Sequence, residues 1–465
     1  MTAQELFEKV KVKALDLGLK AKNSRQTIVE PRGNVIVREN ISDSAFADEK
    51  AYFGFIAEEE ETSGAYFDFS FVVFPEQELG ACVVALCVGS SGFKNDYQLA
   101  TLPGLRRDFL RLRGKKTFFK TNFSDIESTS SALLKEVKNT YPTLAKVIES
   151  YKTVLPAAVV IDNVDAEMDV VYQWLATYAK IRNCGTAEQR EKINNILDAI
   201  ESKDAVDDKS EIQNLLSIRK YVVLQGAPGT GKTWSALQIA DEKYDKTFFE
   251  QFHAETTYSD FVYGLEPNCS AKAGESQFKP KEGILYKAVK YAIGNPKDKV
   301  LLIIDEINRA NLSNVLGPIF YLFEYQSNKR KEVLMLGDIE ISILPDNLHV
   351  IATMNTADRS LAVVDFALRR RFAWYTLRPH IVSDRNFDKK TFNRFADIFY
   401  KYATDEELNL QPGQSYFTDK SLTKERMEYE LMPLIKEYLT EGYLLNARDE
   451  FCSLFLDTTG KLMYE

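Results

Sequence analysis

The sequence predicts an α/β protein: an α+β N-terminal domain, then a parallel sheet covered by helices, then a C-terminal helical domain. Three observations support this prediction. Short apolar runs separated by turn residues fill residues 1–165, continuous apolar runs alternate with helical patterns over residues 209–381, and helical patterns dominate residues 382–465. Buried strands that alternate with helices are typical of a parallel sheet with helices on both faces.

The N-terminal domain is expected over residues 1–165. Runs such as AYFGFIA, GAYFDFSFVVF and GACVVALCVG have the length and the aromatic and β-branched content of strands. Helical patterns flank them near residues 3–20 and 129–153. Residues 166–208 then turn helical and highly charged, so we expect a charged helical linker there.

The sheet domain is expected over residues 209–381. Its strands are, in chain order, YVVLQ, TFFEQF, VLLII, LHVIATM and FAWYTL. The helical domain follows over residues 382–465, where YELMPLIKEYL is the clearest amphipathic stretch.

Bulk properties exclude several classes of protein. The longest apolar runs are far shorter than the roughly 20 residues that span a bilayer, and charges interrupt the apolar pattern of the N-terminus, unlike in a signal peptide. We therefore expect a cytoplasmic protein without a membrane segment. The five cysteines form no C-x-x-C pair, which argues against structural zinc. A net charge of −9 argues against bulk electrostatic coating of nucleic acid.

Charge is segregated within the N-terminal domain. Residues 39–78 hold eleven acidic residues and one lysine, whereas residues 106–120 hold seven basic residues and one aspartate. A solvated charge run is the commoner explanation, and a phosphate-binding face is the alternative. Aromatic side chains nearby could stack on a flipped base, although their strand pattern favours a place in the core. The candidate contacts are Arg106, Arg107, Arg111, Arg113, Lys115 and Lys116 for phosphate, and Tyr66, Phe67, Phe69 and Phe71 for a base.

The stretch GAPGTGKT, residues 226–233, follows the strand YVVLQ and precedes a helical pattern. It matches G-x-x-x-x-G-K-[ST], in which glycines let successive backbone N–H groups and a helix N-terminus face a phosphate. The lysine reaches the β- and γ-phosphates, and the last hydroxyl ligates Mg²⁺. We therefore predict a nucleotide site. Its loop residues are Gly226, Ala227, Pro228, Gly229, Thr230, Gly231, Lys232 and Thr233.

The run VLLIIDEIN supplies the acidic partner of this loop, since it is an apolar strand that ends in Asp305 and Glu306. Asp305 is expected beside the Mg²⁺ ion together with Thr233. Glu306 is expected to polarise an attacking water, so the site should hydrolyse its nucleotide. A buried strand that ends in acids by chance is the alternative.

The next strand leads into MNTADRS, residues 354–360. Asn355 and Asp358 have the N-x-x-D spacing with which GTPases hold guanine, but Thr356 replaces the lysine of N-K-x-D. Parallel topology also sends Asn355 to the phosphate end of the site, where its amide can orient water or contact the γ-phosphate. We interpret this stretch as a sensor and subunit-contact element, with Asp358 and Arg359 coupling neighbouring sites. The choice between GTP and ATP stays open.

Three arginines, residues 369–371, end the helix-like run LAVVDFAL. They cannot all face their own nucleotide, and a position at the sheet edge suits projection toward a neighbouring subunit. We expect Arg370 and Arg371 to act there on the transition state. A solvated basic turn is the alternative.

Taken together, these motifs resemble the McrB family, the motor subunits of modification-dependent restriction systems within the AAA+ superfamily. The resemblance covers about residues 210–440. Ala310, Pro318 and Gln414 depart from the family's common glycine, glutamate and histidine. The matching stretches are GAPGTGKT, FHAETTYSDFVYGLEP, IIDEINRANLSNVLG, PDNLHVIATMNTADRSLAVVDFALRRRF and SYF at 415–417.

The resemblance implies an AAA+ P-loop NTPase core with a C-terminal helical lid. It also implies a homo-hexameric ring that hydrolyses GTP or ATP with Mg²⁺, a McrC-type nuclease subunit as partner, and an N-terminal domain that binds DNA, including modified DNA. Arg448 is a candidate lid arginine. Two other functions stay open: a ring that remodels protein clients, and a protein that uses nucleotide only as an assembly switch.

Overall fold

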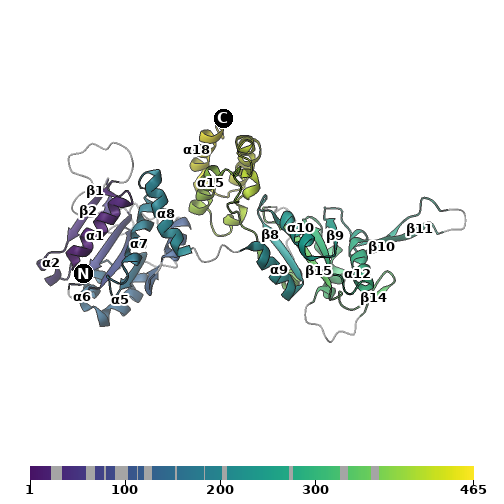
Figure 1. Ribbon diagram of the computed structural model, residues 1–465, viewed down its shortest axis with the longest axis horizontal. Helices are drawn as coiled ribbons and strands as arrows, with labels where there is room; N and C mark the ends of the chain where they lie inside the picture. Colours follow the sequence, from purple (N-terminus) through teal and green to yellow (C-terminus); the bar gives the residue numbers. More distant parts are fainter. Residues whose placement is uncertain are drawn as a thin grey trace. The chain divides into compact units, whose positions relative to one another are not determined.

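The chain forms two units, Met1–Ala205 and Val206–Glu465. Their helices and strands are labelled in Figure 1. The structure is a computed structural model. It describes residues 1–21, 34–58, 69–77, 80–88, 103–112, 114–119, 128–151, 154–182, 184–201, 207–271, 276–324, 333–357 and 366–464.

The first unit is built on a seven-stranded sheet with the order β1-β2-β3-β4-β5-β7-β6. All neighbouring strands are antiparallel except β1 and β2. The strands expected around the three apolar runs are β3, β4 and β5. The bounds are β1 Lys20–Ala21, β2 Asn34–Asn40, β3 Tyr52–Ala57, β4 Phe69–Pro75, β5 Cys82–Val88, β6 Lys116–Phe119 and β7 Ala157–Ile161.

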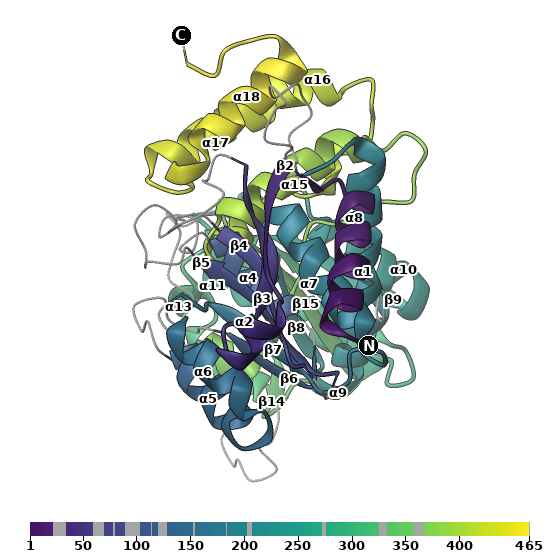
Figure 2. The same cartoon turned by 90° about the vertical axis from the view of Figure 1, so that its left-hand side faces the viewer.

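Helices cover both faces of this sheet because alternate strand residues point to opposite sides (Figure 2). Phe71 and Val73 pack on the face of α1, α4, α7 and α8, whereas Val72 and Phe74 pack on the face of α5 and α6. The central strands β4 and β5 are therefore buried at every position. The helices are α1 Ala3–Asp16, α2 Asp43–Ala47, α4 Pro103–Arg111, α5 Ser128–Thr140, α6 Pro142–Ser150, α7 Met168–Ile181 and α8 Ala187–Glu201.

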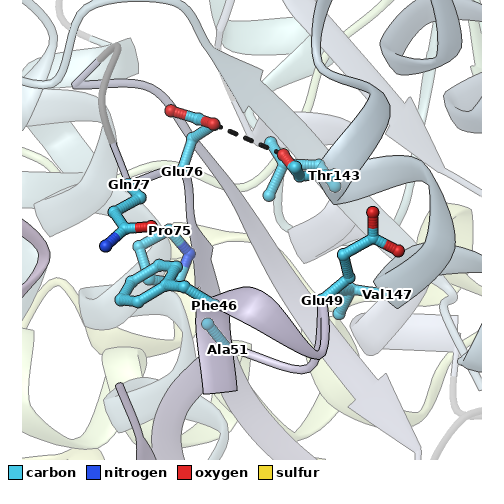
Figure 3. A pocket seen from close by; sticks show the side chains of 9 residues that line it. Phe46, Glu49, Ala51, Pro75, Glu76, Gln77, Thr143 and Val147 are labelled. Carbon is cyan, nitrogen blue, oxygen red and sulfur yellow. Dashed lines mark hydrogen bonds between the residues drawn. The ribbon is translucent and has the colours of Figure 1, made fainter. Parts of the chain in front are cut away.

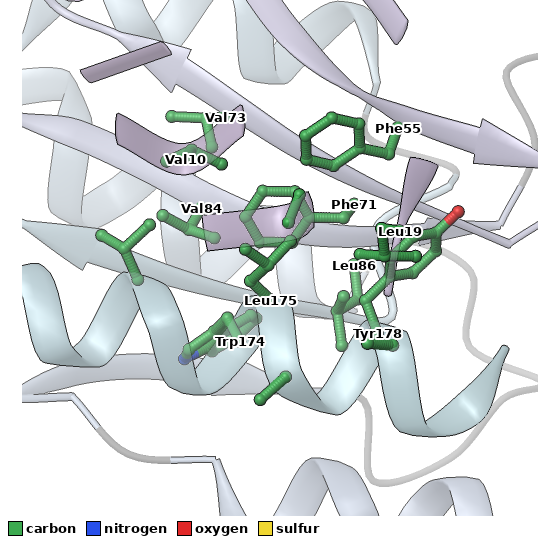
Figure 4. Packing of buried hydrophobic residues seen from close by; sticks show 14 of the residues in the cluster. Val10, Leu19, Phe55, Phe71, Val73, Val84, Leu86, Trp174, Leu175 and Tyr178 are labelled. Carbon is green, nitrogen blue, oxygen red and sulfur yellow. The ribbon is translucent and has the colours of Figure 1, made fainter. Parts of the chain in front are cut away.

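Helix α7 is part of this core (Figure 4). Its Trp174, Leu175 and Tyr178 are fully buried and belong to the same cluster as Phe71 and Leu86 of the sheet. Complete burial of each large apolar side chain stabilises the fold by about 2 kcal/mol. The prediction of a linker over residues 166–208 is therefore wrong where α7 lies, because this helix is part of the core of the first unit. The first unit extends to Ala205.

Two of the aromatic residues considered for base stacking are core residues. Phe69 and Phe71 are fully buried, and both rings lie about 6 Å from the ring of Tyr178. They cannot reach a base without unfolding the sheet. Tyr66 and Phe67 lie outside the described residues.

The second unit contains a five-stranded, all-parallel sheet with the order β16-β8-β15-β12-β9. All five expected strands are present, so the predicted parallel α/β core is confirmed. The bounds are β8 Tyr221–Gly226, β9 Lys246–Gln251, β12 Val300–Asp305, β15 Leu348–Asn355 and β16 Ala373–Thr376.

Both faces of the parallel sheet are covered. Helices α9 and α10 pack on Val222 and Ile303, and α12 packs on Val223 and Leu302. Two short hairpins, β10 with β11 and β13 with β14, complete this part. The bounds are α9 Asp208–Arg219, α10 Lys232–Lys243, β10 Tyr263–Pro267, β11 Phe278–Glu282, α11 Tyr258–Phe261, α12 Ile284–Gly294, α13 Leu312–Val315, η2 Gly317–Phe323, β13 Leu334–Leu336, β14 Ile339–Ile341 and α14 Phe366–Arg371.

A separate apolar cluster holds the C-terminal helices together, with Phe395, Phe399 and Phe451 at its centre. The predicted amphipathic stretch forms η5 and α17. In the described part of the chain, no helix combines the length and apolar character needed to cross a membrane. The bounds are α15 Lys389–Tyr402, η3 Glu407–Leu410, η4 Gln414–Phe417, α16 Thr423–Arg426, η5 Met427–Leu431, α17 Met432–Thr440, η6 Leu445–Ala447 and α18 Arg448–Thr459.

Candidate functional site

The candidate site lies where β8, β12 and β15 end. These neighbouring strands run in the same direction, and Asn355 pairs with Gly226 in register. The carboxyl ends of parallel strands meet at one edge of a sheet, which is where ligands bind in such folds. The topology therefore brings Gly226, Asp305 and Asn355 to one edge, as the sequence predicts.

The loop after β8 wraps tightly before α10 begins at Lys232. Gly229 and Gly231 have φ angles of 77° and 85°, in the left-handed region that glycine tolerates best. A Cβ on Gly226 would lie 2.5 Å from the carbonyl oxygen of Leu377, so this position also requires glycine. Thr230 is buried, and its hydroxyl donates to the carbonyl of Ala227 at 2.9 Å.

Lys232 is buried at the centre of the loop. Its Nζ donates to the carbonyl oxygens of Gly226 and Ala227, each at 2.9 Å. These bonds hold the ammonium group inside the curve of the loop, where a phosphate would replace carbonyl oxygens as its partner.

Asp305 joins the loop to the sheet. Its Oδ1 accepts hydrogen bonds from the Thr233 hydroxyl at 2.7 Å and from the Thr353 hydroxyl at 2.6 Å. Hydroxyl and carboxylate oxygens are the ligands that Mg²⁺ prefers in proteins. The two residues predicted to hold the ion therefore lie in contact.

Thr353 was not among the residues singled out from the sequence. Its hydroxyl oxygen also accepts a hydrogen bond from the backbone N–H of Glu306 at 3.0 Å. One buried hydroxyl thus fixes both acidic residues. The signal for it is a hydroxyl side chain in the otherwise apolar middle of β15, two residues before Asn355 and so on the same face of the sheet.

Glu306 has φ 54°, a left-handed conformation that is uncommon for a residue with a side chain. Strained backbone of this kind clusters at functional sites. Its carboxylate lies 3.6 Å from Nε of Arg309, one helical turn further on. The side chain therefore has a cationic neighbour in its own chain.

Asn355 is tied to the same acidic segment. Nδ2 of the buried Asn308 donates to the Asn355 carbonyl at 3.3 Å. Oδ1 of Asn355 accepts from the backbone N–H of Ala357 at 3.2 Å. The chain thus turns sharply after β15. Asp358 and Arg359 lie outside the described residues.

The three arginines are in different environments. Arg371 is buried, and its Nη2 donates to Oε1 of Glu324 at 2.7 Å. Arg370 is 69% exposed and lies 3.6 Å from the same carboxylate. Arg369 lies over the ring of Trp374, at 5.2 Å from its centroid. We expected both Arg370 and Arg371 to project toward a neighbouring subunit. Arg371 is paired with Glu324 of its own chain, so Arg370 is the remaining candidate.

The helical lid contacts the phosphate loop through residues 413–415. Gln414, where the resemblance expects histidine, is buried and donates from Nε2 to the Thr230 carbonyl at 3.0 Å. Tyr416 packs against Gly229, and burial raises the pKa of its phenol above the usual value.

Two other residues considered from the sequence lie away from this contact. Pro318 lies in the first turn of η2, where a missing N–H costs no helical bond. Arg448 stacks on the Tyr464 ring at 4.5 Å.

The basic segment of the N-terminal unit is only partly available to a phosphate. Lys116 lies 3.0 Å from Glu136 and 2.9 Å from Asp162, and these bonds, the one to Asp162 first, raise its pKa to about 12. Its charge is compensated within the domain, which leaves Lys116 less available to a phosphate than an exposed lysine without such partners. The other candidates are Arg106, Arg111 and Lys115, which are exposed, Arg107, which is half-buried, and Arg113, which lies outside the described residues.

A pocket of about 270 Å³ lies at the end of β4, between α2 and α6 (Figure 3). Phe46 and the carboxylates of Glu49 and Glu76 line it, and the Thr143 hydroxyl donates to Glu76 at 3.4 Å. Two carboxylates repel phosphate groups. The residues that line the pocket include no cation that would bind a phosphate.

Residues 221–372 match the family model of the AAA domain, dynein-related subfamily. The chain is 35% identical over 256 residues to the type IV methyl-directed restriction enzyme EcoKMcrB subunit of Escherichia coli K12, covering 48% of this chain and 54% of that protein. It is 28% identical over 228 residues to the type II restriction enzyme BsuMI component YdiS of Bacillus subtilis 168, covering 40% of this chain and 65% of that protein. The chain thus spans about half to two thirds of the length of these relatives.

The sheet order, the phosphate loop and the acidic strand end define a P-loop NTP hydrolase with an AAA domain. The similarity to the Escherichia coli subunit covers about half of each chain. The second relative is also a component of a restriction enzyme. Residues 221–372 thus form an AAA domain, and over about half of its length the chain is similar to a McrB restriction subunit.

Proposed function

We propose that this chain is the motor subunit of a McrBC-like restriction system. It would hydrolyse GTP or ATP, couple hydrolysis to DNA translocation, and act with a separate nuclease subunit of McrC type. The observation that carries the hydrolytic part is the contact of Thr233 and Asp305 at 2.7 Å, which joins the phosphate loop to the acidic strand end. The restriction role is supported by the similarity of the chain to two components of restriction enzymes.

The residues fit a nucleotide with Mg²⁺. Thr233 and Asp305 would hold the ion, which would offset the charge of the phosphate oxygens when bound. Lys232 would exchange its carbonyl partners for the β- and γ-phosphates. The loop N–H groups from Gly229 to Thr233 would surround the phosphates at the start of α10.

Hydrolysis would then depend on two polar side chains at the sheet edge. Glu306, held by Thr353 through its backbone, would accept a proton from the attacking water. Asn355 would orient that water or contact the γ-phosphate. Glu306 follows β12 and Asn355 ends the neighbouring strand β15, so their spacing is fixed by the backbone.

Arg370 would complete the site of a neighbouring subunit. It is exposed, while Arg371 next to it is buried against Glu324. A site that needs a neighbour's residue requires a ring, and we propose a homo-hexamer that nucleotide stabilises by mass action. Light scattering should show small species shifting to a hexamer when nucleotide and Mg²⁺ are added. A mass that no nucleotide changes would contradict the ring.

The N-terminal unit would bind DNA, including modified DNA, through Arg106, Arg111 and Lys115. A direct test compares turnover of GTP and ATP by the full chain alone, with plain duplex and with methylated duplex. We expect turnover with at least one nucleotide and a further rise with DNA. Turnover that rises only with an unfolded protein client would favour the remodelling function instead. Absence of turnover under all conditions would overturn the proposal.

A further inference from the structure

A short lid segment, residues 413–415, binds the outer side of the phosphate loop. Three consecutive lid residues donate hydrogen bonds to three consecutive carbonyl groups of the loop, so the loop is held along its length. The bonds are Gly413 N to Pro228 O at 2.8 Å, Ser415 N to Gly229 O at 3.1 Å, and Gln414 Nε2 to Thr230 O at 3.0 Å.

The two backbones are in direct contact. A Cβ on Gly413 would lie 2.2 Å from the carbonyl carbon of Gly229, and a Cβ on Gly229 would lie 2.4 Å from Oγ of Ser415. Neither position has room for a side chain. Any shift of this lid segment therefore moves the loop that faces the phosphates.

Gln414 is the one member of this segment that bonds through its side chain. It is 9% exposed, and its Oε1 has no hydrogen-bond partner among the residues that the structure describes. A Cβ on Gly231, the residue before the helix, would lie 3.6 Å from its Nε2. A buried acceptor that lacks a donor is costly, so this oxygen calls for a donor from elsewhere.

The chemistry of the missing donor narrows its source. Phosphate oxygens of a nucleotide are acceptors near neutral pH and cannot donate to Oε1. The nucleoside part of the same ligand carries ribose O–H groups and base N–H groups, which are donors. The amide of Gln414 thus has one end suited to the loop and the other suited to the nucleoside.

We propose that Gln414 reads the nucleoside part of the bound nucleotide: Nε2 holds the Thr230 carbonyl while Oε1 accepts a hydrogen bond from a ribose hydroxyl or a base N–H. Gln414 is thereby a positioning residue for the phosphate loop and a contact for the nucleoside. Occupancy of the nucleoside site then fixes the lid against the loop. The inference rests on the proposed nucleotide site and adds a lid residue to it.

The test uses the full chain and two probes, a nucleoside triphosphate and inorganic tripolyphosphate, each with Mg²⁺ and titrated by calorimetry. Gln414→Met keeps the length of the side chain and removes both amide groups. Loss of the bond to Thr230 affects both ligands, whereas loss of the nucleoside contact affects the nucleotide alone. We therefore expect Gln414→Met to weaken nucleotide binding by about tenfold more than it weakens tripolyphosphate binding, the order of one lost hydrogen bond to a neutral group. Gln414→His, which keeps one donor and one acceptor, should restore most of the affinity.

Gln411→Met is the matched control, since it makes the same chemical change three residues away in the same lid and should leave both affinities unchanged. Thermal melting of the ligand-free variants shows whether each lid is folded. Repeating the titration with 2′-deoxy and 3′-deoxy nucleotides separates the donors: the effect of Gln414→Met vanishes with the analogue that lacks the donating hydroxyl, and persists with both if the base donates.

Two results would overturn the inference alone. Equal weakening of nucleotide and tripolyphosphate would mean that Gln414 acts only on the shape of the loop. Unchanged nucleotide binding by Gln414→Met would mean that its oxygen has no part in recognition. A wild-type chain that binds neither probe would instead overturn the proposed nucleotide site, and this inference with it.

Discussion

Arg371 and Glu324 form an ion pair within one chain, with Nη2 of the arginine 2.7 Å from Oε1 of the glutamate. Arg371 is 7% exposed and Glu324 is 22% exposed, so removal of one partner leaves the other charge partly buried. We predict that Arg371→Ala lowers the free energy of unfolding by about 2 kcal/mol. Chemical denaturation measures this. Arg370→Ala is the control and should stay within about 0.5 kcal/mol of wild type. Equal stability of the two variants would rule out the structural role of Arg371.

Arg370 is predicted to act on a neighbouring site. Arg370→Ala should therefore lower turnover by roughly 10³-fold without loss of stability. Mixing Arg370→Ala with Glu306→Gln subunits provides the decisive assay, since some sites in mixed rings then combine an intact Glu306 with an intact neighbouring arginine. We expect the mixture to be more active than either variant alone. If the mixed rings were as inactive as rings of either variant alone, Arg370 would not act on the site of a neighbouring subunit.

Thr353 is predicted to matter through its hydroxyl, which contacts Asp305 and the backbone N–H of Glu306. Thr353→Val keeps the shape of the side chain but leaves both groups without this partner. Turnover should fall about tenfold to a hundredfold, since the loss of a hydrogen bond to a charged group is worth about 1.5–3 kcal/mol. Thr353→Ser keeps the hydroxyl and should retain most of the activity. If the valine variant were as active as the serine variant, the hydroxyl would have no catalytic relevance.

His349 gives a pH dependence of stability. Burial, with smaller contributions from Lys220 and Lys299, lowers its pKa to about 4, and Nδ1 lies 2.7 Å from the Tyr244 hydroxyl. The unfolded chain binds this proton near pH 6.5, whereas the folded chain does not. Stability should therefore be complete above about pH 6.5 and fall as the pH drops toward about 4. His349→Gln should flatten this slope, and His380→Gln, at an exposed position, should keep it. Identical slopes in all three proteins would contradict the assignment.

The sequence was sufficient for the parallel sheet because each of its strands is a continuous apolar run, and for the phosphate loop because its glycines are adjacent in the chain. It was sufficient for Asp305 and Asn355 as well, since parallel strands must bring their carboxyl ends to one edge.

Other parts depend on contacts between distant segments. Glu324 and Arg371 are 47 residues apart, and nothing near either one predicts the pair. Gln414 meets Thr230 across 184 residues, so the sequence shows an unusual residue before SYF but not its partner. The boundary of the first unit was misplaced because the highly charged sequence of α8 suggested a linker, although α7 before it carries the apolar stripe of Trp174, Leu175 and Tyr178 that faces the sheet.

Turnover by Glu306→Gln tests the central claim most directly. The substitution keeps the size and the backbone position of the side chain but removes its ability to take a proton from water. We predict that the variant binds GTP or ATP with Mg²⁺ as tightly as wild type and that single-turnover hydrolysis falls by at least about a hundredfold. Lys232→Ala, which should lose binding itself, serves as the comparison. Undiminished hydrolysis by Glu306→Gln would contradict the assigned role and, with it, the proposed mechanism.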